Sequence, residues 1–204
     1  MKYLLMAAGR QVKFKMTKEN KDEFFAKLIY AYGKRDDSLI NEYDRSLPFQ
    51  DAMFDRWDRA KKLGFSEGVS IYNSSLVYGN VEINQNTWVG PYTILDGSGG
   101  SINIGEFCSI SAGVHIYTHD TVMWALSGGK NKRKTGSVVI GNFTYVGSKS
   151  LINLGVSIGS RCLVGAGSFV NKSFPDNSII IGSPAKKVGI VKLDSNNEIT
   201  LEYD

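Results

Sequence analysis

Aliphatic residues recur at every sixth position over most of the chain beyond residue 70. The period runs in three blocks, which are Ile71, Val77, Ile83, Val89 and Leu95; Ile104, Ile110 and Ile116; and Ile140, Val146, Ile152, Ile158, Val164 and Val170. This spacing matches neither the about 3.6 residues per turn of an α-helix nor a heptad. Stacked short strands that each place one aliphatic residue inward do produce it, so the pattern predicts a β-solenoid.

Small residues support the same interpretation. A small residue or valine follows most of the aliphatic residues four positions later: Ser75, Val81, Thr87, Thr93, Cys108, Val114, Thr144, Ser150, Val156, Cys162 and Ser168. A large side chain at such a coil corner would collide with the next coil. Glycine commonly follows the aliphatic residue directly, and it permits turn conformations that strain other residues. The alternative is a sandwich of short strands with accidental spacing, and three blocks in one period argue against it.

The N-terminal part has a pattern typical of helices. An apolar stripe at helical spacing is formed by Phe24, Phe25, Leu28, Ile29 and Tyr32. Gly33 is the expected end of this helix. After a break at Pro48, a second helix is expected over residues 51–62, with Met53, Phe54, Trp57 and Ala60 on its inner side. We expect this helical segment to cap the open end of the solenoid, because exposed end strands promote aggregation.

A long interruption of the period covers residues 117–138. It contains His119-Asp120, then an apolar run over residues 122–126, and then the basic residues Lys130, Lys132, Arg133 and Lys134. The segment is too long for a coil corner, and long loops that leave a compact solenoid usually carry function. The predicted organisation is therefore a leader and helical cap (1–68), a repeat domain with an ejected loop (69–188), and a C-terminal tail or hairpin (189–204).

Length and hydropathy exclude some classes of protein. The 204 residues contain no apolar run of 18, so no membrane-spanning helix is expected. The apolar segment of residues 3–8 is too short for the core of a secretory signal. Met16 is a candidate alternative start, which would make residues 1–15 a leader. The cysteines Cys108 and Cys162 both occupy the small-residue position of a repeat, so we expect buried thiols and a cytoplasmic protein.

Charge is distributed unevenly along the chain, whose formal net charge is +4. No Lys or Arg occurs from Val69 to Gly129, whereas ten occur from Lys130 to Lys192 against the single acidic residue Asp176. Nucleic acid is one partner that such a block suggests. The basic residues are scattered and lack interleaved aromatic residues, which favours a small polyanionic ligand over a single-stranded nucleic acid. A solvated basic face that binds nothing is the remaining alternative.

The repeats resemble those of the hexapeptide-repeat acetyltransferases over about residues 69–188. The closest motif runs from Ile140-Gly-Asn-Phe-Thr-Tyr-Val-Gly-Ser to Val164-Gly-Ala-Gly-Ser-Phe-Val-Asn-Lys and closes with Gly182-Ser-Pro-Ala-Lys-Lys-Val. It is similar to the branch of maltose, galactoside and surface-polysaccharide O-acetyltransferases. The resemblance implies a mainly β chain folded as a left-handed parallel β-helix, acetyl-CoA as acyl donor, a sugar or nucleotide-sugar acceptor, a homotrimer, and neither a metal nor nucleic acid.

Acetyl transfer from a thioester needs a base, a donor to the oxyanion, and groups that hold both substrates. An imidazole suits the base, because its ordinary pKa lies near neutral pH. Of the two histidines, His119 follows a coil at the mouth of the loop, and this placement resembles that of the family's catalytic histidine. We therefore expect His119 to be the general base. His115 is an outward-facing candidate that either lines the same cleft or simply lies on the surface.

The resemblance also implies positions for the acyl donor. Ser148 matches the residue whose backbone amide faces the thioester carbonyl, and Ala166 matches a backbone contact to the pantetheine arm. Asn171 and Lys172 match a Thr-Lys pair near the adenine and phosphates, with asparagine replacing threonine here. Lys186 matches a basic residue near the ribose phosphate. Coenzyme A would thus lie along the basic C-terminal coils.

Candidate acceptor residues lie on the coils before the loop. Trp88 and Tyr92 are suited to stacking on sugar rings, or alternatively to packing at a subunit interface. Asp96 matches a family aspartate that can hold hydroxyls or orient an imidazole. Gly90 and Tyr92 replace the asparagines that contact galactosides, so a different sugar is expected. The N-terminal segment also does not match the corresponding motif of the maltose acetyltransferases.

Several functions fit this sequence. The first is a sugar O-acetyltransferase, and the second is an N-acetyltransferase of a nucleotide-linked amino sugar, which differs only in the acceptor nucleophile. A carbonic anhydrase of the same fold is a remote alternative, because its zinc site needs three histidines and this chain has two. A non-catalytic scaffold is the last alternative, and the histidine at the loop mouth and the basic C-terminal half argue against it.

Overall fold

The computed structural model describes residues 3–7, 10–14 and 18–204, with side chains from residue 18 onward. The candidate start Met16 and part of the expected leader lie outside these residues. The chain divides into two compact units, Met1–Met53 and Phe54–Asp204. Within the described part of the chain, no helix has the length and apolar character needed to cross a membrane.

The first unit contains a hairpin and two helices. Strands β1 (Tyr3–Ala7) and β2 (Arg10–Phe14) pair antiparallel, and helices α1 (Lys18–Tyr43) and α2 (Phe49–Met53) follow. The predicted end of the first helix at Gly33 is wrong, since α1 continues for ten residues beyond it. A glycine in a helix costs only about 1 kcal/mol. Burial of Leu39 and the hydrogen bond from the Tyr32 hydroxyl to the Leu47 carbonyl (3.1 Å) offset this cost.

The predicted second helix over residues 51–62 is in fact two short helices, α2 and α3 (Arg56–Lys62). Asp55 interrupts them, because its extended backbone and its carboxylate cap α3 by accepting hydrogen bonds from two backbone amides of the first turn (2.8 and 2.9 Å). Phe54 and Trp57 are 57% and 50% exposed, so their predicted place on the inner side is wrong. Ala60 is buried in the core of the solenoid, so α3 covers the first coil. A capping role for the other helices remains a prediction.

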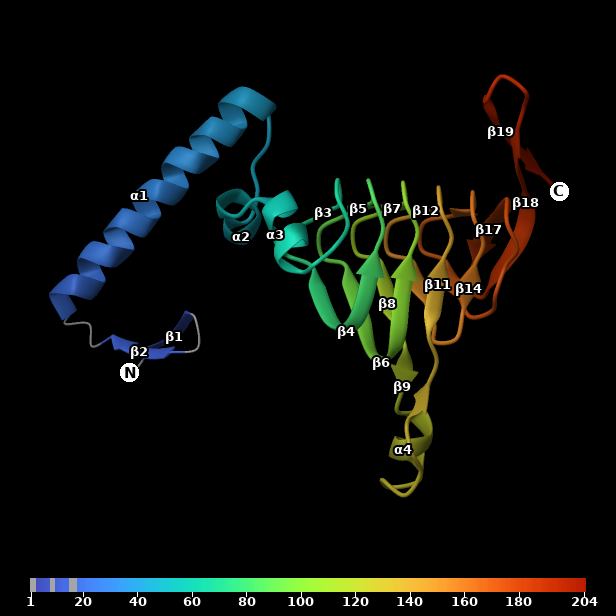
Figure 1. The fold of residues 1–204 in the computed structure, drawn as a ribbon, viewed down its shortest axis with the longest axis horizontal. Coiled ribbons are helices and arrows are strands. Elements are labelled where there is room, and N and C mark those ends of the chain that lie inside the picture. Colours follow the sequence, from blue (N-terminus) through green and yellow to red (C-terminus); the bar gives the residue numbers. More distant parts are fainter. Residues whose placement is uncertain (1–2, 8–9, 15–17) are drawn as a thin grey trace. The chain divides into compact units, whose positions relative to one another are not determined.

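The second unit is a left-handed parallel β-helix with three faces (Figure 1), which confirms the predicted fold class. The first face contains β3 (Ser70–Ile71), β5 (Trp88–Val89), β7 (Ser109–Ile110), β12 (Tyr145–Val146), β15 (Leu163–Val164) and β17 (Ser178–Gly182). The second face contains β8 (His115–Tyr117), β13 (Leu151–Ile152) and β16 (Phe169–Val170), and the third contains β11 (Val138–Ile140) and β14 (Ser157–Ile158). The longer strands β4 (Leu76–Ile83) and β6 (Ile94–Ile104) bend from the second face onto the third.

The aliphatic residues of the six-residue period form the core. On the first face, parallel pairing places equivalent residues directly over one another: Ile71, Val89, Ile110, Val146, Val164 and Ile180. All six are completely buried. Because each buried aliphatic side chain stacks on the next, the coils form one continuous hydrophobic core and the period cannot slip without exposing it.

The small residues near the corners link successive coils by hydrogen bonds. The Thr87 hydroxyl, for example, donates to the Gly105 carbonyl of the next coil (2.8 Å). Cys108 and Cys162 occupy the same position of their repeats and are free and buried, as expected. Burial raises the pKa of both thiols, so they act as small packing groups.

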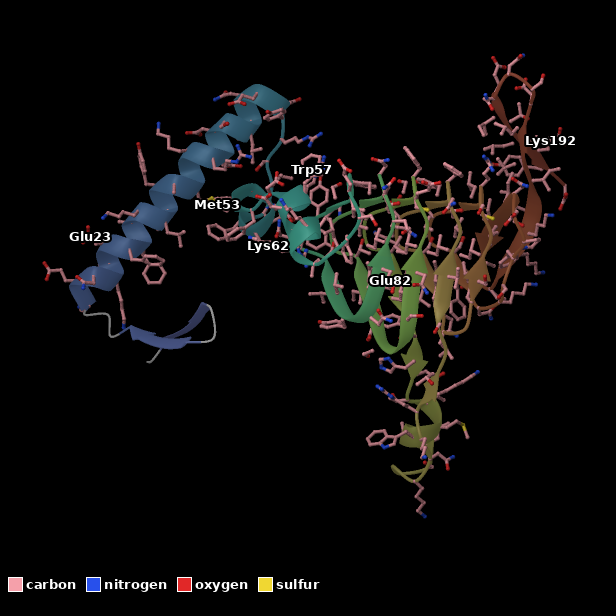
Figure 2. The ribbon with its side chains drawn as sticks, viewed as in Figure 1. Glu23, Met53, Trp57, Lys62, Glu82 and Lys192 are labelled. Carbon is pink, nitrogen blue, oxygen red and sulfur yellow. The ribbon has the colours of Figure 1, made fainter. Side chains whose placement is uncertain are left out.

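The C-terminal segment forms a hairpin that extends from the last coil. Strand β18 (Ala185–Leu193) pairs antiparallel with β17 and with β19 (Ile199–Tyr203). A salt bridge between Lys192 and Glu202 (2.7 Å) joins its two strands. Figure 2 shows Lys192 on this hairpin and Glu82 on a strand near the opposite end of the solenoid.

Candidate active site

The candidate site begins where the strands of the second face end. Asp96 on β6 lies in register between Tyr78 on β4 and Tyr117 on β8. The three additional residues of the period, 98–100, form a bulge within β6 just after Asp96, where the pairing with β4 shifts; this bulge is called the turn below. In this turn the backbone amide and the hydroxyl of Ser98 both donate to Asp96 Oδ1, at 3.0 and 2.6 Å. One carboxylate oxygen of Asp96 is therefore held within its own turn.

The next coil brings Thr118 and His119 against this turn. The backbone amide and hydroxyl of Thr118 donate to the Asp96 carbonyl (3.1 and 2.7 Å), and the Gly99 amide donates to the Thr118 hydroxyl (2.9 Å). A Cβ atom on Gly99 would lie 2.5 Å from His119 Cβ and 2.6 Å from the Thr118 carbonyl oxygen. Glycine at this position therefore allows the turn to approach His119 closely.

This packing places the side chain of His119 beside that of Asp96. The Nδ1 atom of His119 lies 3.8 Å from Asp96 Oδ2, and the two side chains are only 22% and 14% exposed. The Ser98 hydroxyl oxygen is 3.5 Å from the same Nδ1 atom. A carboxylate facing Nδ1 favours the tautomer that is protonated there, which leaves Nε2 able to accept a proton.

The ejected loop leaves and returns at His119. Strand β9 (His119–Asp120) pairs antiparallel with β10 (Lys134–Thr135), with Thr135 opposite His119. Between them the loop projects below the solenoid in Figure 1 and carries α4 (Val122–Leu126), which has no buried residue. On the returning side, the Arg133 guanidinium donates to the Ser98 carbonyl (3.1 Å). The loop thus contacts the turn that holds Asp96.

His115 lies on the second face, and its ring packs edge-on against Tyr117 with 6.0 Å between centroids. The Tyr117 hydroxyl is 3.5 Å from His115 Nδ1. Burial raises the pKa of Tyr117, and the neighbouring Asp96 and Tyr78 raise it further. Tyr117 is therefore a neutral side chain between His115 and Asp96, so His115 contacts an aromatic hydroxyl rather than a carboxylate.

The residues expected to bind the donor lie mainly on the later coils. Ser148 and Ala166 occupy the same corner, between the first and second faces, on consecutive coils, and the amide of Gly167 donates to the Ser148 carbonyl (2.9 Å). Asn171 and Lys172 follow β16 at the corner between the second and third faces.

Two of these donor candidates, Lys172 and Lys186, are cationic and exposed. The Lys172 ammonium lies 5.6 Å from the centre of the Phe174 ring. Lys186 is exposed on the C-terminal hairpin. Ser148 and Ala166 are therefore neighbours, whereas the two lysines lie on other parts of the later coils.

Within one chain, the expected acceptor residues do not lie together. Asp96 joins His119, as described above. Trp88 lies on the first face, where its ring packs edge-on against Tyr72 with 6.4 Å between centroids. Tyr92 is 56% exposed at the corner between the first and second faces. Only Asp96 among the three thus lies next to the candidate base.

The cluster also contains two residues that the sequence did not single out, Ser98 and Thr118, and Arg133, which the sequence identified only as part of a basic run. The available signal was the interrupted period: the three additional residues come directly after Asp96. A cavity of about 400 Å³ lies elsewhere, between the first face and the C-terminal hairpin, and includes Tyr145, Leu163 and Leu201 in its lining. Among the described residues, no group of three or more His, Cys, Asp and Glu side chains is placed to hold a metal ion.

Comparison with known proteins shows that this chain is similar to acyltransferases. The family model described as the hexapeptide repeat of succinyl-transferase matches residues 137–172. The galactoside O-acetyltransferase of Escherichia coli K12 is 30% identical over 129 residues, which cover 61% of this chain and 56% of that protein. A putative acetyltransferase of Staphylococcus aureus Mu50 is 32% identical over 120 residues, 58% of this chain and 59% of the relative. The chain thus spans less than two thirds of these relatives.

Solved structures show the same fold. A galactoside acetyltransferase in complex with coenzyme A superposes with a TM-score of 0.55 and 24% identity over 78% of this chain and 80% of that one. AntD, an N-acyltransferase from Bacillus cereus in complex with dTDP and 3-hydroxybutyryl-CoA, gives a TM-score of 0.52 with 25% identity over 66% of this chain and 89% of that one. Both are acyltransferases built on a solenoid of this kind.

Proposed function

We propose that this chain, which is similar to the hexapeptide-repeat acetyltransferases, transfers the acetyl group of acetyl-CoA to a hydroxyl group of a sugar. The observation that carries the proposal is the position of His119 at the loop mouth, with Nδ1 3.8 Å from Asp96 Oδ2. That arrangement leaves the second ring nitrogen available to an acceptor. A surface-polysaccharide precursor is the acceptor class we favour, and the cytoplasm, where acetyl-CoA is produced, is the proposed location.

In the proposed reaction, His119 Nε2 takes the proton from the acceptor hydroxyl as its oxygen attacks the thioester carbonyl. The backbone amide of Ser148 stabilises the oxyanion of the tetrahedral intermediate. When the intermediate collapses, the carbon–sulfur bond breaks and the proton on His119 passes to the departing thiolate. The products are the acetyl ester and coenzyme A, and Asp96 stabilises the imidazolium that forms between the two proton transfers.

The donor would lie along the later coils. Ala166 is small and exposed beside Ser148, which suits close approach of the pantetheine arm. Lys172 and Lys186 are exposed cations suited to phosphate groups. Asn171 lies next to Lys172 at the end of β16, where we place the adenine end of the donor.

We further propose that the active protein is a homotrimer with sites between subunits. His119 lies at the corner between the second and third faces, whereas Ser148 lies at the corner between the first and second faces. The second face separates them within one chain, so a neighbouring subunit would bring one chain's base to another chain's donor site. The same neighbour would supply surfaces for Trp88 and Tyr92.

N-acetylation of a nucleotide-linked amino sugar is a second candidate. The similarity to AntD, an N-acyltransferase, favours it. Both reactions use the same donor and the same base, and they differ in whether a hydroxyl or an amine attacks.

A thiol-release assay tests both candidates. The purified full chain is incubated with acetyl-CoA and a panel of sugars, polysaccharide fragments, amino sugars and nucleotide-linked amino sugars, and free coenzyme A is measured. We expect acceptor-dependent release with a hydroxyl acceptor and an alkali-labile acetyl ester in the product. An amide product from an amino sugar would favour the second candidate, and no release above hydrolysis with any acceptor would contradict both.

A further inference from the structure

We propose that Ser98 is a positioning residue, whose hydroxyl fixes the Asp96 carboxylate in the orientation that faces His119. The inference rests on the proposed role of His119 as the general base. It concerns the turn formed by the three additional residues after Asp96, which interrupts the otherwise regular period. A coil needs no such turn for its hydrophobic core, since the buried aliphatic residues continue on both sides of it as Leu95 and Ile102.

The first step is that the two carboxylate oxygens of Asp96 have different neighbours. Oδ1 accepts two hydrogen bonds from Ser98, and the shorter one, from the hydroxyl, is 2.6 Å. Short bonds from a hydroxyl to a carboxylate are among the stronger hydrogen bonds in proteins. With Oδ1 occupied, rotation of the carboxylate is restricted, and Oδ2 remains directed toward His119 Nδ1.

The second step is the attachment of this turn to His119 itself. The Gly99 amide donates to the Thr118 hydroxyl, which in turn donates to the Asp96 carbonyl (2.9 and 2.7 Å). The side chain of Asp96, its turn and the backbone preceding His119 are therefore one hydrogen-bonded cluster. Because these bonds fix the backbone of both residues, the distance between the carboxylate and the imidazole depends on the orientation of the two side chains.

The third step links the cluster to the ejected loop. The Arg133 guanidinium donates to the carbonyl of Ser98 (3.1 Å), and Arg133 directly precedes the strand that pairs with His119. The position of Ser98 is thus set both by its own coil and by the returning part of the loop. This contact joins the loop to the turn that orients Asp96, in addition to the strand pairing of the loop with His119.

The experiment replaces the hydroxyl and measures the tautomer of the imidazole. The chain has only two histidines, so nitrogen-15 NMR resolves His119 from His115. At a pH where both rings are neutral, we expect His119 in the wild-type protein to be mainly protonated on Nδ1. In Ser98→Ala we expect a shift toward the other tautomer, with His115 unchanged. We also expect kcat to fall about tenfold, a usual effect of removing a group that orients a functional side chain, with both KM values within about twofold.

Four further variants separate positioning from a general structural effect. Ser98→Thr keeps a hydroxyl and should restore the tautomer and most of kcat. Ser101→Ala is the matched control, since Ser101 lies at the end of the same turn but its hydroxyl pairs with Ser137 (3.1 Å) and not with Asp96. Arg133→Ala should shift the His119 tautomer in the same direction as Ser98→Ala but less, whereas Lys130→Ala, with the same loss of charge in the loop, should leave it unchanged.

Failure of this inference can be distinguished from failure of the proposed function. An unchanged His119 tautomer and kcat in Ser98→Ala would overturn the inference, as would a shift of equal size in Ser101→Ala. The NMR measurement needs no substrate. A tautomer shift in Ser98→Ala, combined with no acetyl transfer by the wild-type protein, would therefore support the positioning role and contradict the proposed function instead.

Discussion

The coils before the ejected loop and the coils after it share one core but differ in their surfaces. From Val69 to Gly129 there is no Lys or Arg, and the period is broken by the turn at Asp96. From Lys130 to Lys192 there are ten, and the coils after the loop are regular. The irregular coils carry the proposed base and its carboxylate, whereas the regular coils present cations. The proposed chemistry therefore lies where the repeat is disturbed, whereas the cations are divided among the ejected loop, the later coils (Lys149, Arg161 and Lys172) and the C-terminal hairpin.

The largest expected effect tests whether the irregular coils carry the chemistry. His119→Ala should lower kcat by roughly 10²–10⁴, the usual range for the loss of a general base. Binding of acetyl-CoA, measured by calorimetry, should remain, because the donor is proposed to lie on the later coils. His115→Ala is the matched control and should cost much less, since its ring contacts Tyr117 and not a carboxylate. A reversal of the two effects would show that the base is misassigned.

An intermediate effect tests the charged coils. Changing both Lys172 and Lys186 to Ala should raise the KM for acetyl-CoA about tenfold or more, because each lysine is proposed to form a charge-assisted contact with phosphate. The KM for the acceptor should change little. Salt screens such contacts, so the wild-type KM for acetyl-CoA should rise with ionic strength and that of the double variant should rise less. An unchanged KM would mean that the basic surface serves another purpose.

The smallest expected change is in the mass of the assembly. It tests whether the base on the coils before the loop of one chain meets the donor site on the later coils of another. Light scattering coupled to gel filtration should give three times the mass of the 22.5 kDa chain. A monomer at micromolar concentration with full acetyl-transfer activity would show that one chain suffices. The proposed separation of base and donor groups on two corners would then be incorrect.

The sequence predicts the solenoid well because its core depends on one local rule. Each inward aliphatic residue stacks on its equivalent in the next coil, so the period alone identifies the buried residues, such as Ile110 and Val146. The helical segment follows no such rule. Gly33 does not end α1, and Asp55 divides the expected second helix, because capping and packing outweigh the propensity of single residues.

The candidate site was predictable only in part. His119 could be found because it stands at the start of a visible interruption, and Asp96 because it resembles a family aspartate. The roles of Ser98 and Arg133 depend on contacts between segments that are about 20 to 35 residues apart, and no periodic pattern records such contacts. Trp88 and Tyr92 lie close to Asp96 in sequence, but the corners of the coil direct them to other parts of the surface.

The loop begins and ends at one point of its coil, where the Gly136 amide donates to the Thr118 carbonyl (2.9 Å). This hydrogen bond and the pairing of β9 with β10 close the base of the loop, so the path of the coil does not depend on how many residues lie beyond it. Insertions and deletions between Thr121 and Lys132 would therefore leave the hydrophobic core intact. The solenoid can thus retain its stability while the loop changes in length and composition.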